Sequence, residues 1–269
     1  MKIALIITTY NRPDALEAVL SSLANQSVMP FEVLIADDGS NEATRILIEK
    51  HLDRYPFKIH HIWQEDRGFR AGAARNRAAS RSQSDYFIFI DGDCIAHPHF
   101  IQAHRNLAKA HFFLSGNRIL LSESFTHQIL SQSLPLHHWS YRQWMQARLS
   151  GKINRFIPLI RSPFDLARHW APKRWRGVKT CNLSLFQQDF ARVNGFDENY
   201  AGWGLEDSDL VIRLIRAGVQ HKSARFAAPV FHLWHKDNDR SQLEENKIRL
   251  NKLLDGHRIQ AELGLDQYL

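Results

Sequence analysis

Two groups of closely spaced carboxylates are the residues of this chain that could do chemistry. Asp91 and Asp93 flank a single glycine directly after the apolar run at 85–90, and Glu-Asp-Ser-Asp at 206–209 comes directly before an apolar helical segment. Two carboxylates one residue apart can converge on a hard divalent cation such as Mg²⁺ or Mn²⁺, which in turn holds phosphate oxygens. An ordinary polar turn is the alternative for the first group, because Asp-Gly-Asp is also common turn chemistry.

The elements that must position these carboxylates alternate between strand-like and helix-like patterns. Apolar runs typical of buried strands lie at 2–7, 31–36, 59–63 and 85–90, and helical patterns begin at 13, 42 and 71. This order predicts a mostly parallel, doubly wound α/β sheet. Open sheets of this kind bind ligands at the carboxyl ends of their strands, where the first acidic group would lie.

The sequence also predicts how two of these helices pack. On the helix at 42–52, Ile46, Leu47 and Leu52 are expected to lie on one side. The helix at 71–80 is rich in small residues, so we expect it to pack closely on the sheet.

The usual phosphate-binding fingerprints are missing from the sequence. There is no GxGxxG after the first strand and no GxxxxGK[ST] anywhere, which disfavours a dinucleotide enzyme and a P-loop NTPase. Phosphate charge must then be met in another way, and a metal at Asp91 and Asp93 together with Arg70 and Arg77 offers one.

Composition sets broad limits. The chain has 269 residues of which 44% are hydrophobic, enough for one large domain or two small ones, and its net charge of +7 implies an anionic partner such as nucleic acid, acidic lipid or a sugar nucleotide. No apolar stretch approaches the roughly 20 residues that cross a bilayer, so a cytoplasmic chain is expected. Cys94 and Cys181 form no CxxC pair, so we expect both to pack in the core.

The pattern changes between 115 and 177, where histidine-, serine- and arginine-rich sequence shows loose helical periodicity and no strong strand. The basic residues between 142 and 179 are interleaved with tryptophans, which suits a membrane-interface surface; a solvated helical face with its tryptophans in the core is the alternative. These tryptophans are Trp139, Trp144, Trp170 and Trp175. We expect a nucleotide-sugar half at 1–114, an acceptor half at 115–240 with a helical insertion at about 118–176, and a helical tail at 241–269.

Strands are expected again at 178–186 and 228–235, with a helix after the second acidic group. Acids in the first turn of a helix favour its dipole, so part of this group could be merely stabilising. That reading does not explain the preceding Gly202-Trp203-Gly204, which combines a flexible backbone with an aromatic surface suited to stacking on a sugar.

Four motifs in this order resemble the family-2 glycosyltransferases of the GT-A fold. They are Thr8-Thr9-Tyr10-Asn11-Arg12, Asp37-Asp38-Gly39-Ser40, the run RGFRAGAARN at 67–76, and Asp91-Gly92-Asp93. The later stretch at 195–209, which contains GWGLEDSD, is similar to the galactosyltransferases that carry a WGxEDxD segment. The two similarities cover most of residues 1–240, and 118–176 is covered weakly.

The resemblance implies a UDP-sugar donor and a Mn²⁺ or Mg²⁺ ion. The implied donor-binding residues are Thr8, Tyr10, Arg12, Asp38, Arg70, Asn76 and Asp91, with the first two and Asp38 on the uracil and ribose and Arg70 on the diphosphate. The implied metal ligands are Asp93, Asp91 and His235, with His232 as the second choice of histidine. Residues three apart in a strand point to opposite faces, so both histidines can bind only if the strand bends or has ended.

On the acceptor side, the resemblance implies that Asp207 takes the proton of the attacking hydroxyl. Glu206 would hold acceptor hydroxyls, alongside Trp203 and Gly204. The family is inverting, so an α-linked donor would give a β-linked product.

The function expected from these residues is sugar transfer from a UDP-sugar to a saccharide hydroxyl, in bacterial surface polysaccharide or lipopolysaccharide synthesis. If the tryptophan- and arginine-rich segment lies at a membrane interface, we expect the chain to bind peripherally to the anionic inner face of the membrane. The acceptor would then be a lipid-linked saccharide. The alternatives are a metal-dependent nucleotidyltransferase, a non-catalytic relative and a basic nucleic-acid-binding protein. No RNP, KH, zinc-finger or helix-turn-helix pattern accompanies the basic residues, so nucleic acid is not expected as a partner.

Overall fold

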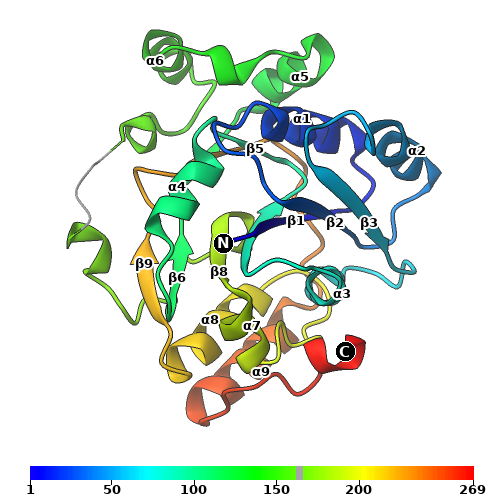
Figure 1. Ribbon diagram of the computed structural model, residues 1–269, viewed down its shortest axis with the longest axis vertical. Helices are drawn as coiled ribbons and strands as arrows, with labels where there is room; N and C mark the ends of the chain where they lie inside the picture. Colours follow the sequence, from blue (N-terminus) through cyan, green and yellow to red (C-terminus); the bar gives the residue numbers. More distant parts are fainter. Residues whose placement is uncertain (162–165) are drawn as a thin grey trace.

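The computed structural model describes residues 1–161 and 166–269 (Figure 1), so four residues of the predicted insertion, 162–165, lie outside the described part. Seven strands in the described residues form one sheet in the order β3-β2-β1-β4-β8-β6-β9. They are β1 (Ile3–Thr9), β2 (Glu32–Asp37), β3 (Lys58–Trp63), β4 (Tyr86–Asp91), β6 (Phe112–Ser115), β8 (Leu183–Phe186) and β9 (Gln220–Ser223).

The amino-terminal part of this sheet is parallel, as predicted. Strand β1 pairs in parallel with β2 and β4, and β2 pairs in parallel with β3. The helices α1 (Pro13–Ala24) and α2 (Glu42–His51) lie on one side of these strands and α3 (Ala71–Ser80) on the other (Figure 1). The doubly wound prediction is therefore confirmed for this half.

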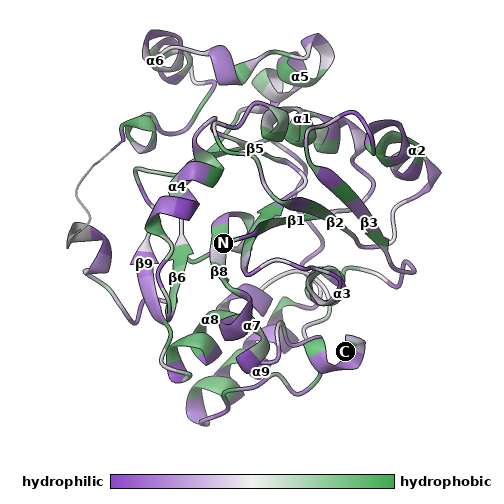
Figure 2. Ribbon diagram, in the orientation of Figure 1, coloured by the Kyte–Doolittle hydropathy of each residue, from purple (hydrophilic) through white to green (hydrophobic). Residues whose placement is uncertain are grey.

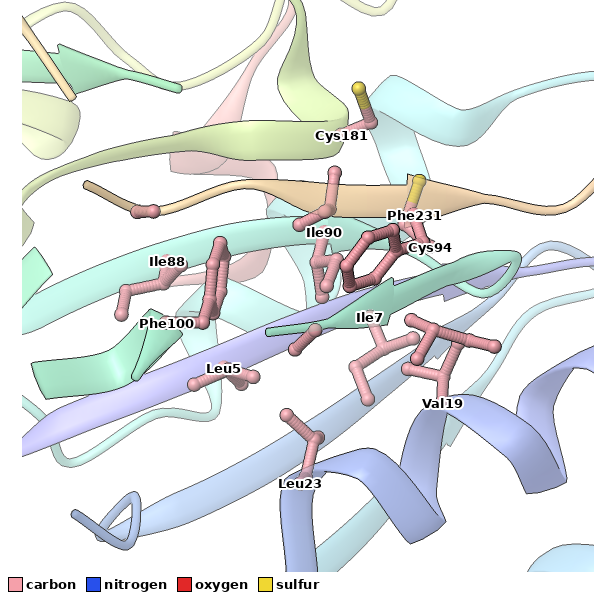
Figure 3. Packing of buried hydrophobic residues seen from close by; sticks show 14 of the residues in the cluster. Leu5, Ile7, Val19, Leu23, Ile88, Ile90, Cys94, Phe100, Cys181 and Phe231 are labelled. Carbon is pink, nitrogen blue, oxygen red and sulfur yellow. The ribbon is translucent and has the colours of Figure 1, made fainter. Parts of the chain in front are cut away.

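Side-chain alternation along β1 builds a core on each face of the sheet. Leu5 and Ile7 point toward α1, where Figure 3 shows Ile7 beside Val19 and Leu5 nearer Leu23. Ala4 lies on the opposite face with Ala74 of α3, so small residues meet and α3 packs closely, as predicted. Hydrophobic residues accordingly follow the central strands in Figure 2.

The exposed side of α2 differs from the prediction. Ile46 and Leu52 are 55% and 38% exposed, whereas Thr44, Ile48 and His51 are buried. These three positions follow the i, i+4, i+7 spacing of one helix face, and Leu47 beside them is half-buried and packs against the core. The predicted apolar face is therefore confirmed for Leu47 and wrong for Ile46 and for Leu52, which lies beyond the last helical residue.

The carboxyl-terminal half adds an antiparallel strand and a second sheet. Strand β8 pairs antiparallel with β4, and β6 is parallel to β9. The second sheet has the order β5-β10-β7, with β5 (Cys94–Ala96), β10 (Val230–His232) and β7 (Arg118–Leu120). The predicted strands at 178–186 and 228–235 are thus shorter, and β7 was missed because three residues are too few to show a period.

The remaining helices surround these sheets. They are α4 (Phe100–Leu107), α5 (Glu123–Gln132), α6 (Tyr141–Leu149), α7 (Gln187–Arg192), α8 (Glu206–Arg216) and α9 (Leu243–Asp255). Short 3₁₀ helices occupy Leu136–His138, Ile157–Leu159, Leu166–His169, Thr180–Asn182 and Leu265–Tyr268. No helix in the described residues has the length and apolar character needed to cross a membrane.

The tryptophans of the predicted insertion do not form one surface. Trp144 is 3% exposed, and its ring stacks on Phe231 with centroids 4.3 Å apart. Trp139 packs on Trp144 at 4.8 Å, whereas Trp170 is 88% exposed. The alternative with tryptophans in the core therefore holds for Trp139 and Trp144.

Candidate functional site

The first acidic group lies where β1 and β4 end side by side. Thr8 is the register partner of Asp91, and the amide of Gly92 donates to the carbonyl of Thr8 at 2.7 Å. A Cβ on Gly92 would approach that carbonyl oxygen to 3.0 Å. A glycine is therefore needed for the close turn that carries Asp93 beyond the strand end.

Two histidines converge on Asp93. Strand β10 runs antiparallel to β5 with His232 opposite Cys94, which places His232 next to Asp93. The Nε2 atoms of His232 and His235 lie 3.6 and 3.3 Å from Asp93 Oδ2. Because β10 ends at His232, the strand parity that would separate the two histidines no longer applies, and both predicted ligands approach one carboxylate.

The residues present fit a divalent metal ion. His235 Nδ1 lies 2.7 Å from the carbonyl of Lys236, which can only accept, so Nδ1 donates there and Nε2 is the ring nitrogen left to bind a metal ion. Burial lowers the pKa of His232, although Asp93 acts to raise it. Two imidazole nitrogens and a carboxylate form a mixed donor set that can bind divalent first-row metal ions.

The first aspartate of the motif, Asp91, is held by a buried arginine, Arg75. Its guanidinium is 3.1 Å from Asp91 and 3.3 Å from Glu206, and its Nε donates to Thr8 Oγ1 at 2.8 Å. Burial acts to lower the pKa of Arg75, but the carboxylates of Asp91 and Glu206 outweigh it and raise the pKa. Arg75 therefore joins the two acidic groups that sequence analysis treated separately.

Sequence analysis missed Arg75 and chose Arg77 instead. Arg77 lies over the Tyr268 ring at 5.3 Å, which does not fit its predicted role of meeting phosphate charge. The sequence signal for Arg75 was its place within a run of alanines and a glycine, and the structure leaves it 4% exposed. A long basic side chain on such a face needs a buried anion as partner.

The second acidic group divides into two parts at the start of α8. Asp207 Oδ2 pairs with Lys179 Nζ at 3.2 Å, and its Oδ1 accepts from the Ser208 hydroxyl at 3.3 Å. Burial raises the pKa of Glu206, and the charge of Asp207 raises it further. Asp209 instead forms an ion pair buried in the core, so only the first two acids belong to the site. Lys179 was a further residue that the sequence did not reveal.

The turn before α8 has an unusual backbone. Gly204 and Leu205 have φ angles of +107° and +77°, and the latter is uncommon for a branched side chain. Asn246 of α9 donates to the carbonyls of Ala201 and Gly204, both at 3.0 Å. The carboxyl-terminal helix therefore holds this turn, and with it the half-buried Trp203, whose ring lies 5.1 Å from the Arg240 guanidinium.

The predicted uracil-binding residues gather at the ends of β1 and β2. Asp38 accepts from the Arg70 amide at 2.7 Å and from the Gln64 side chain at 2.6 Å. Burial raises the pKa of Asp38 to about 6, although both bonds act to lower it. The Tyr10 hydroxyl donates to Asp66 at 2.9 Å, and Tyr10 is 48% exposed, so its ring is open to a ligand.

Three other residues predicted to bind the sugar-nucleotide donor have protein partners of their own. Arg70 Nη2 donates to the Glu65 carbonyl at 2.6 Å, and its buried Nε has no hydrogen-bond partner among the described residues. Arg12 pairs with Asp14 at 3.1 Å. Asn76 is fully buried and bonds the backbone of Phe196 on both its amide atoms, so the predicted donor contact of Asn76 does not fit this geometry.

Both cysteines are free and buried, as predicted (Figure 3). Cys94 Sγ lies 3.5 Å from Asp93 Oδ1, and the ligand atoms of Asp93, Cys94 and His232 lie within 4.8 Å of one another. Burial raises the pKa of Cys94, which therefore remains a thiol at neutral pH.

Known proteins match this chain over most of its length. Residues 4–164 match the model for glycosyl transferase family 2, and residues 165–236 match the model described as the N-terminal domain of galactosyltransferase. Validoxylamine A glucosyltransferase from Streptomyces hygroscopicus subsp. limoneus is 33% identical over 81% of this chain and 48% of its own length. Hyaluronan synthase from Pasteurella multocida is 25% identical over 80% of this chain and 23% of its own length. The chain thus spans about half or less of these curated relatives.

Solved structures share the fold. The 1–349 fragment of TarS from S. aureus, in complex with UDP-GlcNAc, superimposes with a TM-score of 0.64 at 15% identity, covering 100% of this chain and 69% of the fragment. The mannosyltransferase PcManGT from Pyrobaculum calidifontis, in complex with GDP-Man and Mn²⁺, gives 0.59 at 16% identity over 95% and 62% of the two chains. Together with the family match and the α/β sheet, these likenesses show that the chain belongs to glycosyltransferase family 2 and has the GT-A fold.

Proposed function

We propose that this glycosyltransferase is metal-dependent and inverting, and that it moves a sugar from a UDP-sugar to a hydroxyl of a saccharide in bacterial surface polysaccharide or lipopolysaccharide synthesis. The observation that carries the proposal is the approach of His232 and His235 to Asp93, at 3.6 and 3.3 Å. Arg75 connects this group, through Asp91, to Glu206. A donor-side ion site and an acceptor-side carboxylate therefore lie in one network.

On the donor side, Asp93, His235 and His232 would hold Mn²⁺ or Mg²⁺, with Asp91 alongside. The ion would neutralise charge that builds on the leaving diphosphate. The Asp38 carboxylate accepts the uracil N–H, and the exposed ring of Tyr10 stacks on the base. The buried Arg70 Nε has a free proton to donate to a phosphate oxygen.

On the acceptor side, Asp207 takes the proton as the acceptor oxygen bonds to the anomeric carbon. The bond from that carbon to the diphosphate breaks at the same time, and its electron pair leaves with UDP. Attack opposite the leaving group inverts the anomeric configuration. Glu206 holds acceptor hydroxyls, and Trp203 offers an apolar ring face to the sugar.

Two structural neighbours support a metal and a nucleotide-sugar donor. TarS is described with UDP-GlcNAc, and PcManGT with GDP-Man and Mn²⁺. Because the two neighbours carry different nucleotides, UDP as the donor nucleotide rests on the resemblance of the motif around Tyr10 and Asp38. A lipid-linked saccharide is the acceptor that we favour.

A nucleotide-release screen tests this proposal. UDP would be measured from UDP-glucose, UDP-galactose, UDP-N-acetylglucosamine, UDP-N-acetylgalactosamine and UDP-glucuronate, with and without Mn²⁺, and GDP from GDP-mannose. We expect slow Mn²⁺-dependent UDP release from one donor, lost in Asp93→Ala. Release of sugar 1-phosphate, with transfer of the nucleotidyl group, would instead identify a nucleotidyltransferase, and release of GDP alone would contradict the UDP assignment. No release from any donor by the folded chain would contradict catalysis.

A further inference from the structure

The positive charge of the chain is concentrated in one segment. Residues 123–188 contain ten Lys and Arg against two acidic residues, whereas the rest of the chain contains 25 basic and 26 acidic residues. The whole net positive charge therefore belongs to the segment that contains α5 and α6. Such an asymmetry indicates an anionic partner for this part of the molecule, separate from the donor diphosphate.

Helix α6 has an apolar stripe that stays largely exposed, with a ring contact from Tyr141 to Phe156 at 6.5 Å. Tyr141, Met145 and Leu149 are 55%, 42% and 81% exposed, while Trp144 points the other way and is 3% exposed. At 100° per residue, the three exposed side chains span roughly 80° of the helix surface. In Figure 1, α6 lies at the outer end of the molecule, beyond α1 and β5.

Arginines border this stripe on both sides. By the same helical geometry, Arg142 lies about 20° beyond Leu149, and Arg148 lies about 20° beyond Tyr141 on the opposite edge. Both arginines are exposed. A narrow apolar stripe between cationic side chains is typical of a helix that lies in the headgroup region of a membrane.

We propose that α6 docks on an anionic lipid bilayer through Tyr141, Met145 and Leu149, with Arg142 and Arg148 on the headgroups. We call these five residues the α6 surface. A bilayer is favoured over a protein partner because it complements both the apolar stripe and the positive charge of the whole segment. The predicted tryptophan surface is thereby replaced, since Trp139 and Trp144 pack inward.

The same helix connects the α6 surface to the ion site. Trp144 stacks on Phe231 of β10 with centroids 4.3 Å apart, and His232 is the next residue. One helix, about 10 Å across, therefore separates the bilayer from the strand that bears a metal ligand. An acceptor anchored in the bilayer would have its saccharide within reach of the site; this lipid-linked acceptor class rests on the proposed function.

Vesicle co-sedimentation tests the contact. Wild-type chain would be mixed in low salt with phosphatidylcholine vesicles that contain either no or 30% phosphatidylglycerol. We expect sedimentation with the anionic vesicles only, and its loss in high salt, because the attraction is screened. Met145→Glu/Leu149→Glu should lower the apparent partition coefficient at least tenfold, and Arg142→Gln about fivefold.

A matched control is Ile46→Glu/Leu52→Glu, which places the same two charges on exposed apolar residues in and just after α2, 55% and 38% exposed. Any of three results would overturn the proposal. The double variant could bind vesicles as well as wild type does, the control could lose as much vesicle binding as the double variant, or wild type could show no preference for anionic lipid. A fall in solution mass from dimer to monomer in the double variant would assign the α6 surface to a second copy. UDP release measured without vesicles should be the same in the double variant and in wild type. If wild type released no UDP, that result would count against the proposed function and not against the membrane contact.

Discussion

Two carboxylates in the first turn of α8 should respond in opposite ways to substitution. Asp209 pairs with Arg213 at 2.6 Å, both side chains are fully buried, and Arg213 also donates to the Val193 carbonyl at 2.6 Å. Asp207 pairs instead with Lys179, whose side chain is 45% exposed. We therefore expect Asp209→Ala to lower stability, and Asp207→Asn to lower turnover.

The magnitudes follow from burial. Asp209→Ala leaves a guanidinium in the core without its carboxylate, and breaking a buried pair in this way costs about 3–5 kcal/mol. At roughly 2–4 °C per kcal/mol for a chain of this size, the melting temperature should fall by about 6–20 °C. Asp207→Asn keeps the shape of the side chain and frees a lysine that is 45% exposed and can be hydrated, so the cost should be only about 1 kcal/mol. Loss of a general base should lower turnover by about 10²–10⁴-fold.

Thermal unfolding by circular dichroism and UDP release at 20 °C would be measured on both variants beside wild type. If Asp209 stabilises only the core, the Asp209→Ala protein should keep wild-type turnover per folded molecule and unfold at a lower temperature. Equal melting temperatures for the two variants would refute the assignment of Asp209 to the core and of Asp207 to the site. Wild-type turnover in Asp207→Asn would refute its assignment as the base.

Three further predictions concern the donor site and the acceptor turn. Asp93→Ala should abolish the rise in melting temperature that Mn²⁺ gives wild type, measured by thermal shift. Uridine affinity, followed by calorimetry, should fall roughly tenfold from pH 7 to pH 5, because the pKa of Asp38 is raised to about 6 and only its ionised form accepts the uracil N–H. Asn246→Ala should lower stability by about 1–3 kcal/mol in urea unfolding, since the carbonyls of Ala201 and Gly204 lose their donor.

Each of these has an outcome that contradicts it. An Mn²⁺ shift that survives in Asp93→Ala would place the ion elsewhere. Asp38→Asn serves as the control for the pH effect, and a persisting pH dependence in this variant would assign the titration to another group. An unchanged unfolding midpoint in Asn246→Ala would mean that α9 does not hold the turn.

The parallel half of the fold could be predicted from the sequence because the patterns that indicate its strands and helices are local. Continuous apolar runs mark strands buried on both faces, and the helices between them set the crossover order. The acids at strand ends could therefore be assigned to one edge of the sheet before any coordinates were known. By contrast, β7 and the shortened β8 owe their existence to pairing partners distant in the chain, and the α2 face depended on which neighbours α2 meets.

The sequence by itself predicted which motifs carry the chemistry, and it correctly predicted that Asp91 and Asp93 lie at the carboxyl end of a central strand. Only the tertiary structure decided that His232 and His235 both reach Asp93, because this depends on the antiparallel pairing of β10 with β5. It also decided that Arg75 joins the two acidic groups, that Asp209 serves the core, and which side chains of α6 face outward. Each of these is set by burial against residues far away in sequence, which no local pattern of charge or hydrophobicity records.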